Sequence, residues 1–262
     1  MSKSLLIMVL TFFFLFGCAE KKKNNSKSQE DSSAVPIEEV TQDGWESLFD
    51  GKTFNGWRGL GRDHVPKEHW RIEEGTIRKL NSGLVSSLPD GQPAEGGDLM
   101  TIASFENYEL YFEWKISKAG NSGLKYNVSE EMSQKYDSKY AALGFEYQLL
   151  DDGDEVYANL VASHLSGSLY DIIPAGNVTL KPIGEFNSSR ILINGNHVEQ
   201  WLNGVKVLEF EFGSNRLDSL YKKSKYKEYS NFLEKRKGHI VLQNHKDDAW
   251  FRNIRIREIK SN

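Results

Sequence analysis

Three stretches of the sequence alternate apolar and polar residues, and their polar positions hold side chains that can do chemistry. In the first, 143–150, Glu146 and Gln148 point away from an apolar face. The outward residues of the other two, 197–202 and 238–245, are His197, Glu199 and Trp201, and His239, Val241, Gln243 and His245. Carboxylates, amides and imidazoles hydrogen-bond to hydroxyl groups, and an indole packs on the C–H face of a sugar ring. If the three strands are neighbours in one concave sheet, they form a carbohydrate site.

The same pattern also fits a sheet without a ligand, because the outer face of an antiparallel sheet is often polar and open to water. A glycosidase with two catalytic carboxylates is less well supported. Glu146 and Asp151 are five residues apart, so strict alternation places them on opposite faces. A retaining enzyme needs its two carboxyl groups about 5 to 5.5 Å apart.

Three charged groups outside these runs each have two interpretations. The acidic run Asp151–Glu155 is either a cation loop or an acidic turn, and its spacing, unlike that of a known calcium loop, favours the turn. Lys181, close to Glu185, either forms a salt bridge or presents its ammonium group to a substrate oxygen. Arg252 and Asn253 either tie loops together or contact a ligand.

Short alternating runs bounded by turn residues predict the elements that position these groups. The runs lie at 69–79, 98–103, 108–116, 121–128, 143–150, 190–203, 205–212, 238–245 and 249–259. Their number and length predict an all-β fold, a sandwich or barrel of antiparallel sheets. Asn194-Gly195 and Asn203-Gly204 favour tight turns, so 190–212 is predicted to be a three-stranded meander. Loosely helical spacing of apolar residues predicts one or two short helices near 215–237.

The N-terminus has the pattern of a bacterial lipoprotein signal. Lys3 precedes an apolar run, 5–16, which is too short to span a bilayer as a mature helix and ends at Gly17-Cys18. We therefore predict a signal peptide at 1–17, lipid attached to Cys18, a flexible tether at 18–42 and a folded domain at 43–262. The alternative is an ordinary signal cut elsewhere. Because Cys18 is the only cysteine, the domain has no disulfide and no cysteine nucleophile.

Charge and hydropathy limit the kinds of molecule that the protein is expected to bind. A net charge of −4 and a pI near 5.9 argue against a nucleic-acid partner, which would need a basic face. No second apolar span follows the signal, so lipid is the expected membrane anchor. The residues after Cys18 lack the acidic run of a surface-export signal, which favours an outer-membrane position facing the periplasm.

Seven short motifs, in order along the chain, carry a family resemblance. They are Leu48–Lys52 with Gly56-Trp57, Gly120–Tyr126, Gly144–Asp151, Lys181-Pro182 with Gly184–Asn187, Trp201–Gly204, Gly238–His245 and Phe251–Ile254. Together they resemble the 3-keto-disaccharide hydrolase domain family over nearly all of residues 45–259. The sequence departs from the family pattern at Phe186, where tryptophan is usual, and at Asn244 and Lys246, where aspartate and glycine are commoner.

The resemblance implies a concanavalin A-like jelly roll and an enzyme that cleaves glycosides already oxidised to a ketone at C3. A C3 ketone acidifies the C2 proton, so a base can form an enolate and the C1 substituent can leave by β-elimination. Such a route needs a base, a donor to the enolate oxygen and an acid for the leaving group. The resemblance implies Glu146 and His245 as base and acid, with Lys181 or a divalent cation at the enolate. The predicted sugar-positioning residues are Asn121, Tyr126, Gln148, Trp201, Gln243 and Arg252.

Two other functions stay open at this point. A non-catalytic, lectin-like sugar-binding module would use the same polar and aromatic face, and a purely structural lipoprotein domain would bind no sugar. Whether water adds back to complete a net hydrolysis, and whether a metal takes part, also stay open.

Overall fold

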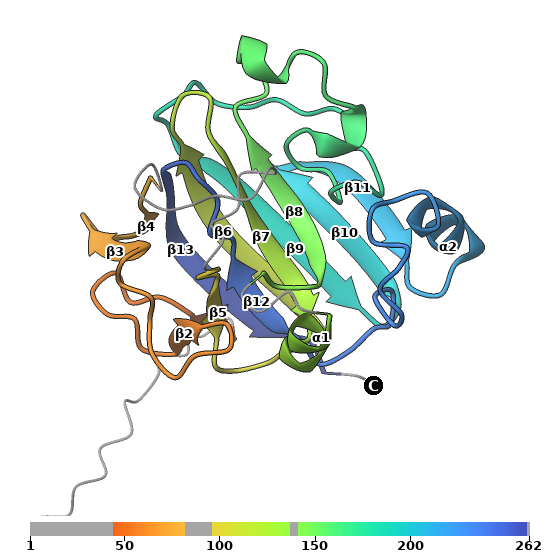
Figure 1. The fold of residues 1–262 in the computed structure, drawn as a ribbon, viewed down its shortest axis with the longest axis horizontal. Coiled ribbons are helices and arrows are strands. Elements are labelled where there is room, and N and C mark those ends of the chain that lie inside the picture. Colours follow the sequence, from red (N-terminus) through yellow and green to blue (C-terminus); the bar gives the residue numbers. More distant parts are fainter. Residues whose placement is uncertain (1–43, 82–95, 137–140, 261–262) are drawn as a thin grey trace, which may run out of the picture. The chain divides into compact units, whose positions relative to one another are not determined.

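Alternating strands fold into two antiparallel sheets that share one apolar core (Figure 1). The computed structural model describes residues 44–81, 96–136 and 141–260. The predicted signal, Cys18 and tether lie outside the described residues and stay predictions. Within the described ranges, no helix combines the length and apolarity needed to cross a bilayer.

The larger sheet, sheet A, has eight strands within the described residues. In spatial order they are β11 (Val205–Glu211), β10 (His197–Leu202), β9 (Asn187–Asn194), β6 (Tyr108–Ile116), β13 (Ala249–Glu258), β4 (Thr76–Lys79) and β3 (Trp70–Glu73), with β1 (Glu46–Ser47) paired to β13. The predicted strand at 69–79 is thus two strands, because Glu74 and Gly75 both adopt positive φ in a tight turn.

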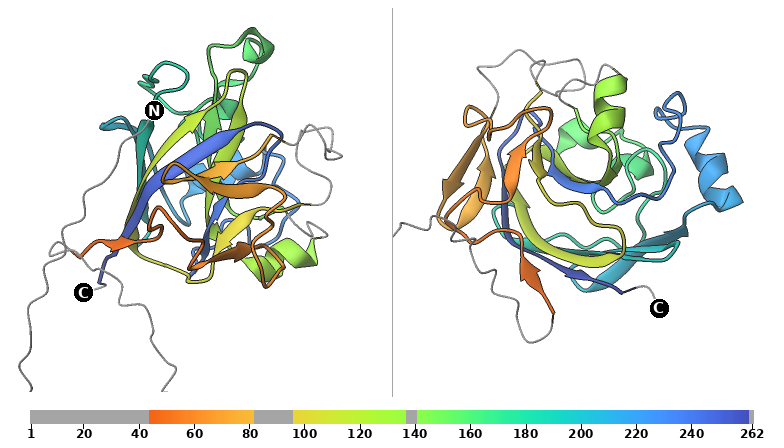
Figure 2. Two further views of the ribbon diagram at one scale, coloured as in Figure 1. Left: turned by 90° about the vertical axis from the view of Figure 1, so that its left-hand side faces the viewer. Right: turned by 90° about the horizontal axis from the view of Figure 1, so that it is seen from below.

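The smaller sheet, sheet B, packs against sheet A, and the two form curved layers when seen from below (Figure 2). Its strands, in order, are β2 (Trp57–Gly59), β5 (Leu99–Thr101), β12 (His239–Leu242), β7 (Asn121–Val128) and β8 (Phe145–Leu150). The predicted all-β sandwich of the jelly-roll kind is confirmed.

Helices are few and short among the described residues. They are α1 (Glu130–Lys135), α2 (Asn215–Tyr221) and two 3-10 turns, Glu155–Tyr157 and Ala162–His164. Helix α2 confirms the prediction for 215–237, whereas α1 was not predicted. Both α-helices begin at a serine whose side chain accepts a backbone N–H of the first turn, Ser129 from Met132 and Ser214 from Leu217.

The meander β9-β10-β11 is present as predicted, but its two turns differ. Asn203 and Gly204 both have positive φ, 48° and 83°, which is the geometry expected of an Asn-Gly hairpin. Asn194 instead ends β9, and the loop begins at Gly195 with φ 61°. Asn203-Gly204 therefore forms the whole turn, whereas Asn194-Gly195 spans the end of β9 and the first residue of the loop.

A buried tyrosine and a buried glutamine form a polar bridge between the sheets. Tyr126 of β7 is fully buried, and its hydroxyl donates to Oε1 of Gln200 on β10 at 3.0 Å. Gln200 in turn donates its Nε2 to the carbonyl of Gly167. The prediction that Tyr126 binds sugar is therefore wrong: its side chain fills the core, where it completes the hydrogen bonding of a buried amide.

The outer face of sheet B is covered instead of being open to water. All six residues of β8 are buried, and a second apolar cluster packs on this outer side. Its members are Leu60, Met100, Val128, Ala142 and Val241. Helix α1 is held beside it by Glu130, which accepts two hydrogen bonds of 2.7 Å from Arg58 of β2. Polar side chains on this face must therefore find partners within the protein.

The bridge between the sheets leads to a stability prediction. Tyr126→Phe should lower the free energy of unfolding by about 1–3 kcal/mol, because Oε1 of Gln200 loses its donor while staying buried. Tyr108→Phe is the matched control, since the buried Tyr108 hydroxyl has no hydrogen-bond partner among the described residues. Urea unfolding measures both. Equal losses in the two variants would contradict the bridge.

Candidate functional site

A small cavity of about 30 Å³ opens on the outer face of sheet B. Its lining residues are Asn121, Glu146, Gln148, Tyr170, Lys225, Gln243 and His245. The structure therefore brings together five of the residues predicted from sequence, and it adds Tyr170 and Lys225.

Strand pairing explains why these side chains meet. β7 lies between β12 and β8, so Lys125 is opposite both Glu146 and Val241. Gly123 is opposite Gln148, and its carbonyl accepts the backbone N–H of Gln243. Because alternate residues share a face, the outward side chains of three neighbouring strands converge.

Gly123 makes the space that Glu146 occupies. A Cβ atom at position 123 would lie 2.7 Å from Oε1 of Glu146 and 2.9 Å from its Cγ. The glycine is thus required by the approach of a carboxylate and not by its own backbone, whose φ is not positive. The sequence around Gly123 is built to admit a large acidic side chain on the next strand.

Glu146 is a buried carboxylate beside a buried ammonium group. It is 4% exposed, and Nζ of Lys125 lies 3.8 Å from its Oε2. Burial raises the pKa of Glu146 above its usual range, although the positive charges of Lys125 and Lys225 and a hydrogen bond from Gln243 act in the opposite direction. A carboxyl group with a raised pKa is suited to proton transfer near neutral pH.

His245 reaches the cavity from the segment that follows β12. This segment is fixed by its neighbours: the backbone N–H of Asn244 donates to Asp98 at 2.7 Å, and its side-chain Nδ2 donates to the carbonyl of Gly96. Asp247 accepts the backbone N–H of Asn121 at 3.1 Å. Asn244, which departs from the family pattern, therefore anchors the loop and is not among the cavity-lining residues.

Two amides in the cavity keep an acceptor available. Nε2 of Gln148 donates to Oδ1 of Asn121 at 3.3 Å. The Oε1 atoms of Gln148 and Gln243 are buried and have no hydrogen-bond partner among the described residues. Because buried polar atoms are normally hydrogen-bonded, these oxygens suit the hydroxyl groups of a bound molecule.

Lys125, Asp98, Tyr170 and Lys225 were not predicted for the site. Lys125 could have been found, since it shares the alternation phase of Asn121 and Gly123 on one strand. Tyr170 and Lys225 come from loops, and no periodicity marks them. These loops meet where the backbone N–H of Lys225 donates to Asp171 at 2.6 Å and its Nζ lies 4.6 Å from the Tyr170 ring centroid.

Three predicted residues lie with sheet A and are not brought to the cavity. Trp201 of β10 packs under the guanidinium group of Arg190, whose Cζ atom lies 4.1 Å from the centroid of the Trp201 ring. Arg252 of β13 pairs with Glu113 at 2.7 Å, and the backbone of Lys181 is held by Asn187 at the start of β9.

Strand order is the physical reason for this correction. β10 and β13 hydrogen-bond into sheet A, so their outward side chains face the opposite side of the sandwich from those of β7 and β8. The expectation that 197–202 joins 143–150 and 238–245 in one concave sheet is wrong. Lys181, Trp201 and Arg252 are therefore not placed to act with Glu146.

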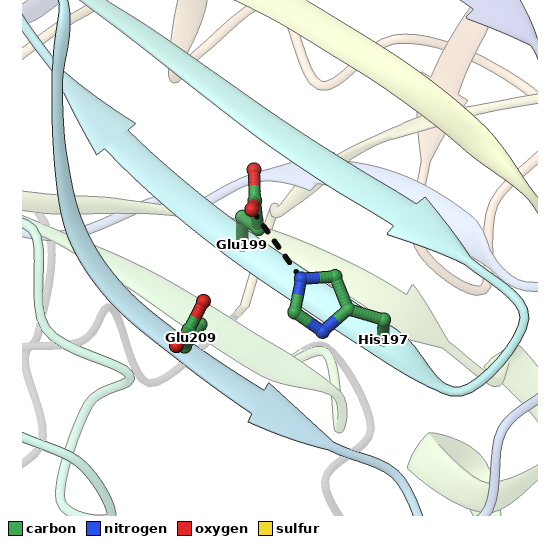
Figure 3. Close-up of side chains that lie close together, drawn as sticks. All are labelled: His197, Glu199 and Glu209. Carbon is green, nitrogen blue, oxygen red and sulfur yellow. Dashed lines mark hydrogen bonds and ion pairs between the residues drawn. The ribbon is translucent and has the colours of Figure 1, made fainter.

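A cluster of metal-ligating side chains lies on the sheet A side of the sandwich. Among the described residues, one cluster brings three metal-ligating atoms within 4.8 Å of one another: His197, Glu199 and Glu209 on β10 and β11 (Figure 3). Nζ of Lys206 already lies 3.2 Å from Glu199 and 2.5 Å from Glu209. Hydrogen bonding to Glu211 raises the pKa of His197, which favours its positively charged form. Positive side chains of the protein thus balance the negative charge of Glu199 and Glu209.

The acidic run Asp151–Glu155 forms a turn whose carboxylates bind backbone N–H groups. Asp151 accepts from Ala119, Asp152 from Ser166, and Asp154 from Val156 at the start of a 3-10 turn. The acidic-turn interpretation of this run therefore holds, with each carboxylate used to fix a neighbouring loop.

Comparison with known proteins gives consistent matches over the whole described domain. Residues 44–257 match the family model described as a 3-keto-alpha-glucoside-1,2-lyase-like domain. A Bacteroides thetaiotaomicron protein named 3-keto-disaccharide hydrolase is 38% identical over 245 residues, covering 87% of this chain and 81% of that protein.

Solved structures agree on the fold. A crystal structure of a "putative glycosyl hydrolase" from Parabacteroides distasonis superposes with a TM-score of 0.70 at 28% identity, covering 83% of this chain and 95% of that one. A second from the same organism has a TM-score of 0.60 at 24% identity, with 82% and 99% covered.

The buried charge of Glu146 leads to a pH-dependent stability prediction. Because burial raises its pKa in the folded state, Glu146 stabilises the fold fully below its unfolded pKa, and this contribution is lost as pH rises through the folded pKa. The side chain in Glu146→Gln carries no charge. The variant should therefore match the stability of the wild type at about pH 4, close to the unfolded pKa of glutamate, and be more stable than the wild type at about pH 7 to 8. Urea unfolding across this range measures the difference.

Glu130→Gln is the matched control with the opposite sign. The hydrogen bonds from Arg58 hold the pKa of Glu130 below its usual range, so its contribution is present above the unfolded pKa and lost as pH falls. This variant should be less stable than the wild type at neutral pH. A Glu146→Gln protein that loses as much stability at neutral pH as Glu130→Gln would contradict the assignment of a costly buried charge.

Proposed function

Because the chain belongs to the family of 3-keto-alpha-glucoside-1,2-lyase-like domains, we propose that it cleaves the glycosidic bond of sugars already oxidised to a ketone at C3. One observation carries the proposal: Glu146, a buried carboxylate whose pKa is raised by burial, shares an amide-lined cavity with His245. A ketone at C3 makes such a single base sufficient, because it acidifies the proton at C2. The named activity of the Bacteroides relative supports the same substrate class.

Glu146 acts as the base in the proposed reaction. Its carboxylate takes the proton from C2, the C–H electron pair forms the C2=C3 bond, and the ketone oxygen becomes an enolate. The enolate then returns its electrons, the C1–O bond breaks, and the departing oxygen takes a proton from His245. Elimination yields an unsaturated keto sugar and the free alcohol. Addition of water across its C1=C2 bond completes a net hydrolysis.

Lys225 replaces Lys181 as the positive side chain available to the enolate. It lines the cavity, whereas Lys181 is exposed and held at the start of β9. A cation beside a developing oxyanion stabilises the transition state more than the ground state. A divalent cation at the enolate is the alternative, and turnover with a chelator tests it.

Polar side chains around Glu146 orient the ring. Gln148 and Gln243 present acceptor oxygens, and Asn121 holds the Gln148 amide. The cavity, about 30 Å³ in this structure, must widen to admit a sugar ring. The departing group would extend past Tyr170 and Lys225 toward solvent.

A lectin-like module is the competing function, and the structure offers one reason to prefer an enzyme. A sugar-binding site needs hydrogen-bond partners but no buried group with a raised pKa. Burying a carboxylate costs stability unless it is paired, and such groups concentrate where proton transfer occurs. Glu146 therefore favours catalysis.

Turnover of a 3-keto-glucoside tests the function directly. The wild type should release the alcohol from the 3-keto compound and leave the parent glucoside intact. In D₂O the hydrated sugar product should gain deuterium at C2, as read by mass spectrometry. Glu146→Gln and His245→Ala should each lower kcat/KM by about 10²- to 10⁴-fold, the usual loss for a general acid or base. Parallel reactions with a chelator test metal dependence.

Several results would oppose this function. Unchanged turnover in both variants would show that Glu146 and His245 are not the base and the acid. Equal binding of the 3-keto compound and the parent glucoside, with no product from either, would indicate the lectin-like module.

A second activity prediction concerns Gly123. Gly123→Ala should lower kcat/KM by about tenfold or more, because the new Cβ displaces the Glu146 carboxylate and a shift of about 1 Å is enough to impair catalysis. Gly153→Ala is the control, since a Cβ there meets nothing closer than 3.9 Å. Wild-type kinetics in Gly123→Ala would show that Glu146 need not hold its observed position.

A further inference from the structure

Three buried side chains of alternating charge form a row behind the cavity. Nζ of Lys125 lies 3.7 Å from Oδ2 of Asp98 and 3.8 Å from Oε2 of Glu146. Asp98 is 1% exposed, and Lys125 and Glu146 are each 4% exposed. Water therefore does not screen these charges, and their mutual attraction is much stronger than that of a surface pair.

Each member of the row apart from Glu146 is fixed from behind. Asp98 accepts the backbone N–H groups of Ala142 at 2.8 Å and Asn244 at 2.7 Å. Lys125 donates to the carbonyl of Ala142 at 3.2 Å. The ammonium group is thus held by a carbonyl and two carboxylates. Only Glu146 continues into the cavity, since Asp98 and Lys125 are not among its lining residues.

We propose that Lys125 is a positioning residue that orients the Glu146 carboxylate and keeps it ionised for proton abstraction, while Asp98 fixes Lys125. This inference rests on the proposed role of Glu146 as base. Lys125 has no direct access to substrate, so it acts only through Glu146. The second oxygen of Glu146, Oε1, lies on the Gly123 side.

The other charged and titratable groups near Glu146 do not replace Lys125. Lys225, from the segment after α2, also favours the ionised form, but it is exposed and screened by solvent. Asp98, before β5, opposes ionisation. The remaining neighbours are Tyr170, Tyr226 and His245. Burial is the largest influence on the pKa of Glu146, and Lys125 is the largest one that lowers it.

Two lysine variants separate charge from structure. Lys125→Met removes the ammonium group and should move the acidic limb of the kcat/KM profile to higher pH by about one unit or more, the usual effect of an opposite charge at this distance. Lys125→Arg keeps the charge and should keep the limb close to the wild-type position. Lys115→Met, on the outer face of sheet A, is the control and should leave the profile unchanged.

A direct titration makes the test independent of turnover. Carbon-13 NMR of glutamate-labelled protein, with Glu146 assigned by its loss in Glu146→Gln, reports the Glu146 pKa in each variant. The Lys125→Met signal should titrate at higher pH than the wild type. Should Lys125→Met fail to fold, Asp98→Asn provides the opposite sign: removal of a negative charge should move the Glu146 titration to lower pH.

The two possible failures give different results. A shifted Glu146 titration in a protein that does not turn over the 3-keto compound supports the effect of Lys125 on the charge of Glu146 and rejects the proposed function. An unshifted titration together with an unshifted acidic limb in Lys125→Met overturns the role of Lys125, whether or not the enzyme is active.

Discussion

The carboxylate of Asp98 joins the three segments that form the floor of the cavity. One oxygen accepts the backbone N–H of Asn244, which leads to His245, and the other accepts that of Ala142, which precedes β8. The same carboxylate faces Lys125 of β7. Because these segments carry His245, Glu146 and Asn121, one buried side chain sets the relative positions of the residues that form the site. Buried carboxylates are costly unless paired, and here the pairing is with groups the site needs.

The two outer faces of the sandwich shift the pKa values of their carboxylates in opposite directions. On sheet A, Glu109 receives hydrogen bonds from Arg190 and Arg257, and these arginines hold its pKa below the usual range despite burial. On sheet B, Glu146 faces a lysine at 3.8 Å, and burial raises its pKa. The first arrangement keeps a carboxylate charged as part of the surface, and the second allows it to exchange a proton. Environment, not residue type, separates the two roles.

Alternation in the sequence predicted which residues share a face, but not which sheet a strand joins. Glu146, Gln148, Gln243 and His245 were correctly grouped because β8 and β12 both pair with β7. Trp201 was grouped with them wrongly, since strand order depends on long-range hydrogen bonds that leave no local pattern. The same logic would have corrected Tyr126, whose alternation phase differs from that of Gly123 and Lys125. Tyr170 and Lys225 lie on loops, and only the folded chain brings those loops over the sheet.

Covering the outer face of sheet B connects the fold to the proposed chemistry. An open face would let water solvate Glu146, and its pKa would then stay near that of a free carboxyl group. The apolar cluster around Val241 covers part of this face, and burial raises the pKa of Glu146, which suits a carboxylate that takes a proton. Burial alone favours the neutral form of Glu146. The ammonium group of Lys125, which is also buried, acts in the opposite direction, so burial on one face of the sandwich accompanies both opposing influences on the base.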